Sequence, residues 1–221
     1  ALKLALQTAR SQANEGFNLD MWATLVNRDG VVCAVDFTGA SSGDQWPGSR
    51  LISAQKANTA NAFSLPGLVL STANLYSAVQ PGGSLYGLQH SNPVNTEVGY
   101  RGNPANNGQP NDAMVGGRIG GVNVFGGGLA LYNSSHVLVG AVGVSGDSSC
   151  ADHNIAWRTR HNMNLDFLPP GVSGDASRPD NIVYDVVNTP GLPIGVSASG
   201  WGHPACSAAA TAIAGTLPVK R

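Results

Sequence analysis

The stretch GVSGDSSCADHNIAWRTRH, residues 143–161, passes from a Gly-rich apolar strand into a helix predicted over residues 149–163. Gly140, Gly143 and Gly146 have no side chains, which favours close packing of a helix against this strand. The helix carries a concentration of polar, aromatic and reactive side chains: Cys150, Asp152, His153, Trp157, Arg160 and His161. Their number raises the question of whether they form a reactive site or only a well-capped helix.

The segments before this stretch predict a regular order of elements. Residues 1–14 have the apolar spacing of a helix, and Asp29-Gly30 lies between two β-runs as the turn of a hairpin. A helix is predicted over residues 49–65, with a short helical piece at 68–78. A second hairpin turns at Asn133-Ser134-Ser135. This order predicts one α/β domain whose largely antiparallel sheet is built from two hairpins and flanked by helices.

Two segments lack strong periodicity. Residues 80–121 are rich in Gly, Asn and Pro, and such a long loop is typical of a functional or surface-wrapping insertion. Beyond the predicted domain of residues 1–163, the chain is mostly turns, with one strand predicted at residues 181–187. We therefore interpret residues 164–221 as a C-terminal extension that wraps the domain.

Composition excludes several classes of protein. The 221 residues include 12 Lys and Arg against 13 Asp and Glu, for a net charge of −1. No basic stripe is visible, so we expect no nucleic-acid partner. No run approaches the roughly 18 consecutive apolar residues of a membrane span, so we expect no span either. With 42% hydrophobic and 11% charged residues, the chain is predicted to fold into a globular protein.

Three cysteines leave one over if two of them pair. Cys33 lies in an apolar run and is expected to be a buried, inert thiol. Cys150 and Cys206 both lie beside polar, His-containing loops, and a disulfide between them would join the C-terminal tail to the core. Sequence alone leaves this pairing open, because it does not give the distance between the two residues. A disulfide would indicate an oxidising compartment.

The start of the predicted helix has a capping pattern. Ser149 and Asp152 have the S-x-x-D spacing of a capping box, and the helix dipole favours an acidic residue in the first turn. His153 and His161 are eight residues apart, which is roughly 12 Å along a helix axis. A straight helix therefore cannot bring both to one metal ion. His153 is the stronger candidate because it lies at the strand-to-helix junction.

The other histidines and the absence of several known motifs limit the kinds of site that the sequence can form. His90 and His203 lie in Gly/Pro loops of the kind that often carry binding residues, whereas His136 in the hairpin turn is expected to be exposed. The chain has no C-x-x-C-H, so covalent c-type heme attachment is not indicated. It also lacks H-E-x-x-H, a P-loop and G-x-S-x-G. The glycine run at 126–128 precedes a strand, which does not support a dinucleotide fingerprint.

Three segments resemble the GlcG/HbpS-like family of heme-binding and heme-degrading proteins. They are the hairpin ATLVNRDGVVCAVDFTGA, the helix ISAQKANTANAF and the second hairpin ending VLVGAVGVSGDSSCADHNIA. With the first helix, the resemblance covers roughly residues 1–78 and 122–163. The insertion, the tail and the start CADH of the last helix depart from shorter members. A bacterial periplasmic or secreted subgroup is most similar, with no leader present in this chain.

The resemblance implies non-covalent binding of heme or another tetrapyrrole. Heme needs an apolar slot, one or two axial ligands and cations for its propionates. We expect His153 to ligate the iron, with His90, His161 or His203 as alternatives, and Met114 or Met163 as weaker ones. The candidate cofactor-binding residues are His153, His161, His90, Trp157, Arg160, Arg158, Lys56, Thr59 and Asp152.

Two other functions stay open at this point. The first is an enzyme acting on a small oxidised metabolite, with Lys56, Thr59, Asp152 and His153 as its polar groups. The second is a structural subunit, in which the insertion and the extension make contacts in a larger assembly. We expect a homo-oligomer, and sequence does not decide whether the protein is an enzyme.

Overall fold

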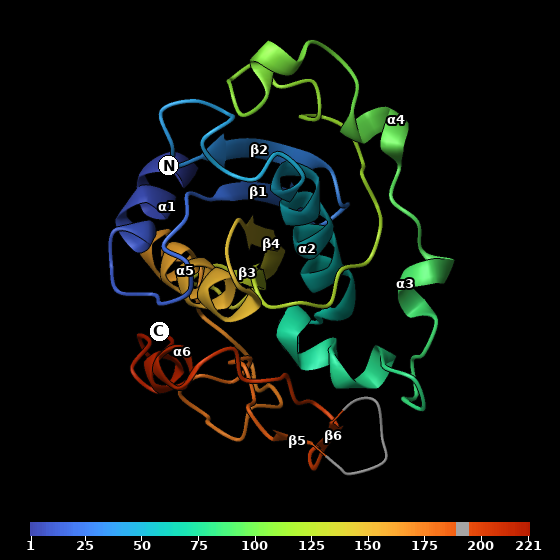
Figure 1. Cartoon of the computed structure of the whole chain (residues 1–221), viewed down its shortest axis with the longest axis vertical. Coiled ribbons are helices and arrows are strands. Elements are labelled where there is room, and N and C mark those ends of the chain that lie inside the picture. Colours follow the sequence, from blue (N-terminus) through green and yellow to red (C-terminus); the bar gives the residue numbers. More distant parts are fainter. Residues whose placement is uncertain (189–194) are drawn as a thin grey trace.

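A single four-stranded sheet forms the centre of the fold. The computed structural model describes residues 1–188 and 195–221 (Figure 1). The strands are β1 (Trp22–Asn27), β2 (Val32–Phe37), β3 (Gly128–Tyr132) and β4 (Leu138–Ser145). They lie in the order β2-β1-β4-β3 and every neighbouring pair is antiparallel. The predicted fold class, an α/β domain with a sheet built from two hairpins, is confirmed.

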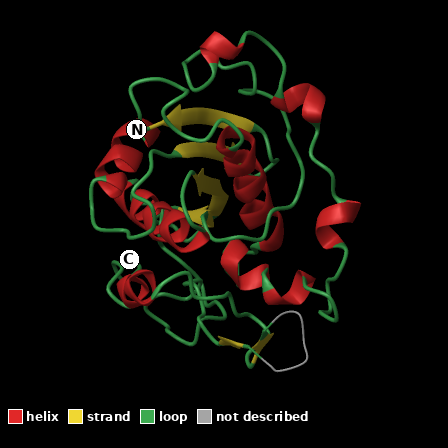
Figure 2. Cartoon of the chain, in the orientation of Figure 1, coloured by secondary structure: helices red, strands yellow, loops and turns green. Residues whose placement is uncertain are grey.

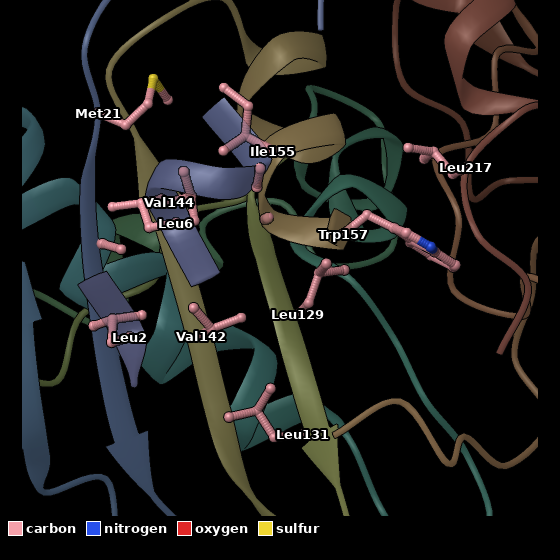
Figure 3. Close-up of a cluster of buried hydrophobic side chains, with 13 residues drawn as sticks. Leu2, Leu6, Met21, Leu129, Leu131, Val142, Val144, Ile155, Trp157 and Leu217 are labelled. Atoms are coloured by element: carbon pink, nitrogen blue, oxygen red, sulfur yellow. The ribbon is translucent and has the colours of Figure 1, made fainter. Parts of the chain in front are cut away.

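Helices cover both faces of the sheet (Figure 2). One face packs against α1 (Leu2–Arg10) and α5 (Ser149–Asn162), and the other packs against α2 (Ser49–Phe63). Figure 3 shows the first of these cores, where Leu6 of α1 and Ile155 of α5 meet Val142 and Val144 of β4. Burial on both faces explains why β4 reads as a nearly continuous apolar run.

Gly143 allows α2 to lie directly on β4. A Cβ atom at this position would lie 1.9 Å from the Ser53 carbonyl oxygen and 2.5 Å from the Ala57 amide nitrogen of α2. The close helix–strand packing predicted from the glycines is therefore confirmed at Gly143. Gly140 and Gly146 instead lie against the backbone at Val26 and Asp20.

We expect Gly143→Ala to destabilise the fold by about 1–3 kcal/mol, because the added methyl group pushes α2 away from the sheet. Urea unfolding measures the change. Gly67→Ala is the matched control, since a Cβ there meets no atom within 4 Å. Equal effects of the two substitutions would contradict this packing.

Most predicted elements are present, with shorter bounds. The predicted helix over 1–14 ends at Arg10, after which the Asn14 side chain donates a hydrogen bond to the Ala9 carbonyl. The helical piece predicted at 68–78 consists of two 3-10 turns, η1 (Thr72–Leu75) and η2 (Ser77–Val79). Both predicted hairpins are confirmed.

The insertion follows the outside of α2 and β2 in short turns (Figure 1). Its elements are α3 (Leu88–Ser91), α4 (Thr96–Gly99) and η3 (Pro104–Asn106). Arg50 of α2 forms a buried ion pair with Asp112. The amides of Gly116 and Val32 bond across to the carbonyls of Val32 and Gly117, which ties the insertion to the outer strand β2.

The C-terminal segment is held to α5 by a buried ion pair. Both carboxylate oxygens of Asp180 accept hydrogen bonds from the Arg160 guanidinium, at 2.6 and 2.9 Å. The strand predicted at 181–187 is limited to β5 (Val186–Val187), which pairs with β6 (Val196–Ser197). Helix α6 (Ala208–Ala214) follows. Residues 189–194 of the predicted extension lie outside the described residues.

The structure also bears on membrane-spanning helices and on the exposure of Cys33. Among residues 1–188 and 195–221, no helix is long and apolar enough to cross a membrane. The expectation that Cys33 is buried is wrong, because its side chain is exposed on β2. Neighbours Val32 and Val35 are buried, so the apolar run marks the strand correctly but not the face to which each residue points.

Candidate functional site

A hollow of about 220 Å³ opens where α5 begins, beside α2 and the loop before β3. Its floor is polar, whereas its exposed lining is aromatic, with Trp46 51% and Phe125 45% exposed. The lining residues are Trp46, Ser49, Ile52, Lys56, Asn123, Phe125, Ser145, Asp147, Ser149 and Asp152. A concave site with apolar walls and a few converging polar groups is the usual form of a small-molecule site.

Lys56 and Asp152 form a buried ion pair in this hollow. The Lys56 ammonium donates to Asp152 Oδ2 at 2.7 Å and to the Val144 carbonyl at 3.1 Å. Asp152 Oδ1 accepts from the amides of Gly146 and Asp147. Burial raises the pKa of Asp152 to about 6, and the Lys56 cation opposes that rise. Two residues predicted as site residues are thus brought together.

The prediction that Ser149 and Asp152 form the capping box of α5 is wrong. Ser148, not Ser149, is the N-cap of α5, and its hydroxyl accepts from the Ala151 amide. Asp152 reaches back to the two amides before the helix, so its carboxylate does stabilise the helix start, as the dipole favours. Ser149 is the first helical residue, and its hydroxyl is available for other contacts.

The Ser149 hydroxyl is hydrogen bonded to His203. It accepts from the Gly126 amide at 2.8 Å and lies 2.8 Å from His203 Nε2. His203 Nδ1 lies 2.7 Å from the Pro204 carbonyl oxygen, which can only accept, so Nδ1 carries the proton and Nε2 accepts from Ser149. Burial lowers the pKa of His203 to about 4, and the imidazole is neutral at pH 7.

A disulfide joins the two sides of this contact. Cys150, next to Ser149, is bonded to Cys206, three residues after His203. This is the pairing that sequence left open. The Cys150 amide also lies 3.3 Å from the Cys206 sulfur. The covalent link holds the His203 loop against the first turn of α5.

His153 lies next to the site but does not open into it. Its side chain is fully buried, and its Nε2 lies 3.2 Å from both Asn181 Oδ1 and the Ile182 amide. Its Nδ1 has no hydrogen-bond partner. Burial lowers the pKa of His153 to about 3, and the Arg160 cation acts in the same direction. Asn181 and Ile182 of the C-terminal segment therefore cover this imidazole.

The other histidines lie away from the hollow. His161 Nδ1 lies 2.7 Å from Asp166 Oδ2 near the end of α5, and Arg221 contacts the same ring. His90 is exposed on α3. His136 is exposed in the second hairpin turn, as predicted. Among the described residues, no group of three or more His, Cys, Asp or Glu side chains could hold a metal ion.

The remaining predicted site residues have structural partners. Arg158 donates to the Ala13 carbonyl and to the Asn14 side chain, and Arg160 binds Asp180. The Arg160 guanidinium also lies 4.5 Å from the centre of the buried Trp157 ring. Thr59 Oγ1 accepts from the Asn123 amide, so it positions a residue that lines the hollow.

Trp46, Phe125 and the Ser149 hydroxyl were not among the predicted site residues. The glycine run at residues 126–128 could have pointed to this region, because glycines let the loop before β3 come close to α5. A Cβ at Gly126 would lie 2.4 Å from the Ser149 carbonyl oxygen. Met114 and Met163, the weaker ligand candidates, pack in the hydrophobic core instead.

The chain belongs to the HbpS-like family of haem-degrading proteins, whose sequence model matches residues 1–160. A solved PduOC–heme complex is 24% identical, with a TM-score of 0.51, and the match covers 74% of this chain and 90% of that one. The Klebsiella pneumoniae protein ORFY is 23% identical, with a TM-score of 0.50, over 73% of this chain and 84% of that one. At these identities, the two comparisons show a shared fold and nothing further. No curated protein matches the chain.

Proposed function

We propose that this protein binds heme or a closely related tetrapyrrole non-covalently, at the hollow beside the start of α5. Membership of a haem-degrading family supports the ligand class. The observation that carries the location is the pair of exposed aromatic rings, Trp46 and Phe125, that line the hollow. Exposed aromatic side chains are suited to a planar, apolar ligand.

The hollow would hold only an edge of a tetrapyrrole ring, against the aromatic side chains at its rim. The hollow of about 220 Å³ is small, so its exposed aromatic lining has to supply much of the contact surface. His203 lies behind the lining residue Ser149, and its Nε2 could bind a metal only after the Ser149 side chain gives up their hydrogen bond and moves aside. Bound heme would supply an iron centre for oxygen chemistry. Lys56 could pair with a propionate only by sharing its bond to Asp152.

His153 remains the alternative ligand. For its Nε2 to reach iron, Asn181 and Ile182 must first move away. Arg158 and Arg160 would likewise have to leave buried partners to reach propionates. His203 has to lose one contact of its Nε2, to Ser149, whereas the His153 Nε2 has to lose two, so we favour His203 as the ligand.

The test is a hemin titration followed by Soret absorbance. We expect saturable binding by the wild type and affinity weakened roughly tenfold in Trp46→Ala, because a lost aromatic contact of about 1.4 kcal/mol is one factor of ten. Tyr100→Ala, which removes another exposed aromatic ring, is the matched control. His203→Ala is expected to change the Soret position, whereas His153→Ala is expected to leave it unchanged.

Other outcomes would overturn parts of the proposal. No Soret change at tens of micromolar hemin would remove heme as the ligand. Binding that is lost in His153→Ala but kept in Trp46→Ala and His203→Ala would move the site to the region covered by the C-terminal segment.

We also propose that the protein works in a periplasmic or secreted setting as a homo-oligomer. The Cys150–Cys206 disulfide supports an oxidising compartment, since such bonds are rare in the cytosol. Light scattering of the purified protein measures the oligomer directly, and a monomer at all concentrations would contradict that part.

A further inference from the structure

The contacts of Ser149 have the order found in nucleophilic serine sites. A hydroxyl donates to an imidazole Nε2, and the opposite nitrogen donates to a fixed acceptor that holds the tautomer. Here these groups are Ser149 Oγ, His203 and the Pro204 carbonyl, with distances of 2.8 and 2.7 Å. A serine used only as a helix cap would accept from its own helix, but Ser149 does not.

The hydroxyl also has access to a ligand. Ser149 lines the hollow and is partly exposed, whereas His203 lies behind it and is only 3% exposed. Ser149 Oγ accepts one hydrogen bond from Gly126 and donates one to His203, which leaves one lone pair free. The Ser149 amide is the first N–H of α5 and has no acceptor within the helix, so it can donate to a developing oxyanion.

We propose that Ser149, with His203 as its general base, is the nucleophile of an acyl-transfer site that accepts small, uncharged carboxylic esters. Ser149 Oγ bonds to the ester carbonyl carbon while its proton passes to His203 Nε2. That proton then goes to the leaving alkoxide oxygen as its C–O bond breaks. Water releases the acyl group as a carboxylic acid, giving one proton to His203 Nε2, which returns it to Ser149 Oγ.

The lining of the hollow sets the substrate class. Trp46, Phe125 and Ile52 provide apolar contacts for an aryl or short alkyl group. The one cation, Lys56, is already paired with Asp152, so nothing in the hollow's lining favours a charged ester. The volume of about 220 Å³ favours a small molecule over a long acyl chain.

The position of His203 carries its role as the base. Its Nδ1 proton is held by the Pro204 carbonyl oxygen at 2.7 Å, which leaves Nε2, 2.8 Å from Ser149 Oγ, as the atom that takes the serine proton.

The test uses the oxidised full-length protein with two probes, diisopropyl fluorophosphate and p-nitrophenyl acetate. We expect a single diisopropylphosphoryl adduct on Ser149, formed with loss of fluoride and located by peptide mass spectrometry, and an acetyl adduct on the same residue. Ser149→Ala should abolish both adducts. His203→Asn should slow their formation by about 10²-fold, the lower end of the range for a general base.

Matched controls separate this role from general reactivity. Ser134→Ala and His136→Asn change an exposed serine and an exposed histidine of the second hairpin turn, and both should react like the wild type. The adduct position in the wild type needs no variant, so it stands even if His203→Asn folds poorly. No adduct, or adducts spread over several serines, would overturn the proposal.

The ester proposal does not rest on heme binding, but the two ligands would compete, because both proposals use the same hollow and His203 Nε2. If both proposals hold, saturating hemin should slow the labelling of Ser149. Labelling that is unaffected by bound hemin would leave the nucleophile in place and move the heme elsewhere. A Soret shift without labelling would keep heme and remove the ester chemistry.

Discussion

Replacing Lys56 with Met should lower the free energy of unfolding by about 3–5 kcal/mol, one of the two largest effects that we expect from this structure. The Lys56 ammonium and the Asp152 carboxylate are both almost fully buried, 2.7 Å apart. Removing the cation leaves an anion that burial disfavours. Urea unfolding of the variant and the wild type at pH 7 measures the loss.

The effect of Lys56→Met should depend on pH. Burial already raises the folded-state pKa of Asp152 to about 6, and loss of Lys56 raises it further. Because this pKa exceeds the unfolded value, the folded state binds the proton more tightly, and stability falls as pH rises through the folded-state pKa. The variant should therefore be less destabilised at pH 5 than at pH 8.

Two further variants isolate the buried charge. Lys3→Met removes an exposed lysine and should cost less than about 1 kcal/mol. Adding Asp152→Asn to Lys56→Met should restore part of the lost stability, because no unpaired charge then remains buried. A double variant as unstable as the sum of the two single ones would contradict this account.

Removing the disulfide is the second large effect. Cys150 and Cys206 are 56 residues apart in the chain, and the chain-entropy relation for a loop of this length gives about 4 kcal/mol of stability. We expect Cys150→Ala with Cys206→Ala to lose about this amount in urea unfolding. Labelling of Ser149 should slow as well, because the His203 loop is then no longer tied to α5.

Cys33→Ser is the control for thiol chemistry. Cys33 is exposed and unpaired, so its replacement should change stability by less than about 0.5 kcal/mol. A loss below about 1 kcal/mol in the double cysteine variant would mean that the other contacts of the C-terminal segment, such as Arg160 with Asp180, hold it without the bond.

The fold was largely predictable because its signals are local. Asp29-Gly30 marks a hairpin turn by its backbone preference, and the glycines of β4 predict a helix against the strand. The sequence did not predict where α1 ends or the face of β2 to which Cys33 points. Helix α1 ends at Arg10, and Cys33 points outward although its run is apolar.

The site was only partly predictable because it depends on contacts between residues distant in sequence. Lys56 and Asp152 were identified, but their pairing across 96 residues is a property of the tertiary structure. Arg158 and Arg160 looked available for an anionic ligand, whereas the folded chain supplies them with internal acceptors. The contact of Ser149 with His203 could have been predicted once Cys150 was known to pair with Cys206, since both residues lie within three positions of the bond.

The division of the chain stays a prediction. The segment after residue 163 contacts the rest of the chain through Asp180, Asn181 and Pro218. Whether residues 164–221 are a separable extension is a question for limited proteolysis and truncation.

The hydrogen bonds that the chain makes at the two outer strands limit how copies of it can associate. Val32 on β2 is bonded to the insertion, and Tyr132 on β3 is bonded to Leu165 after α5. A free strand edge is a template for the strand of a neighbour, which leads to continuous sheets and aggregation. Here that template is interrupted on both sides by the chain itself. Copies of this protein should therefore meet through side-chain surfaces and form assemblies of limited size rather than fibres.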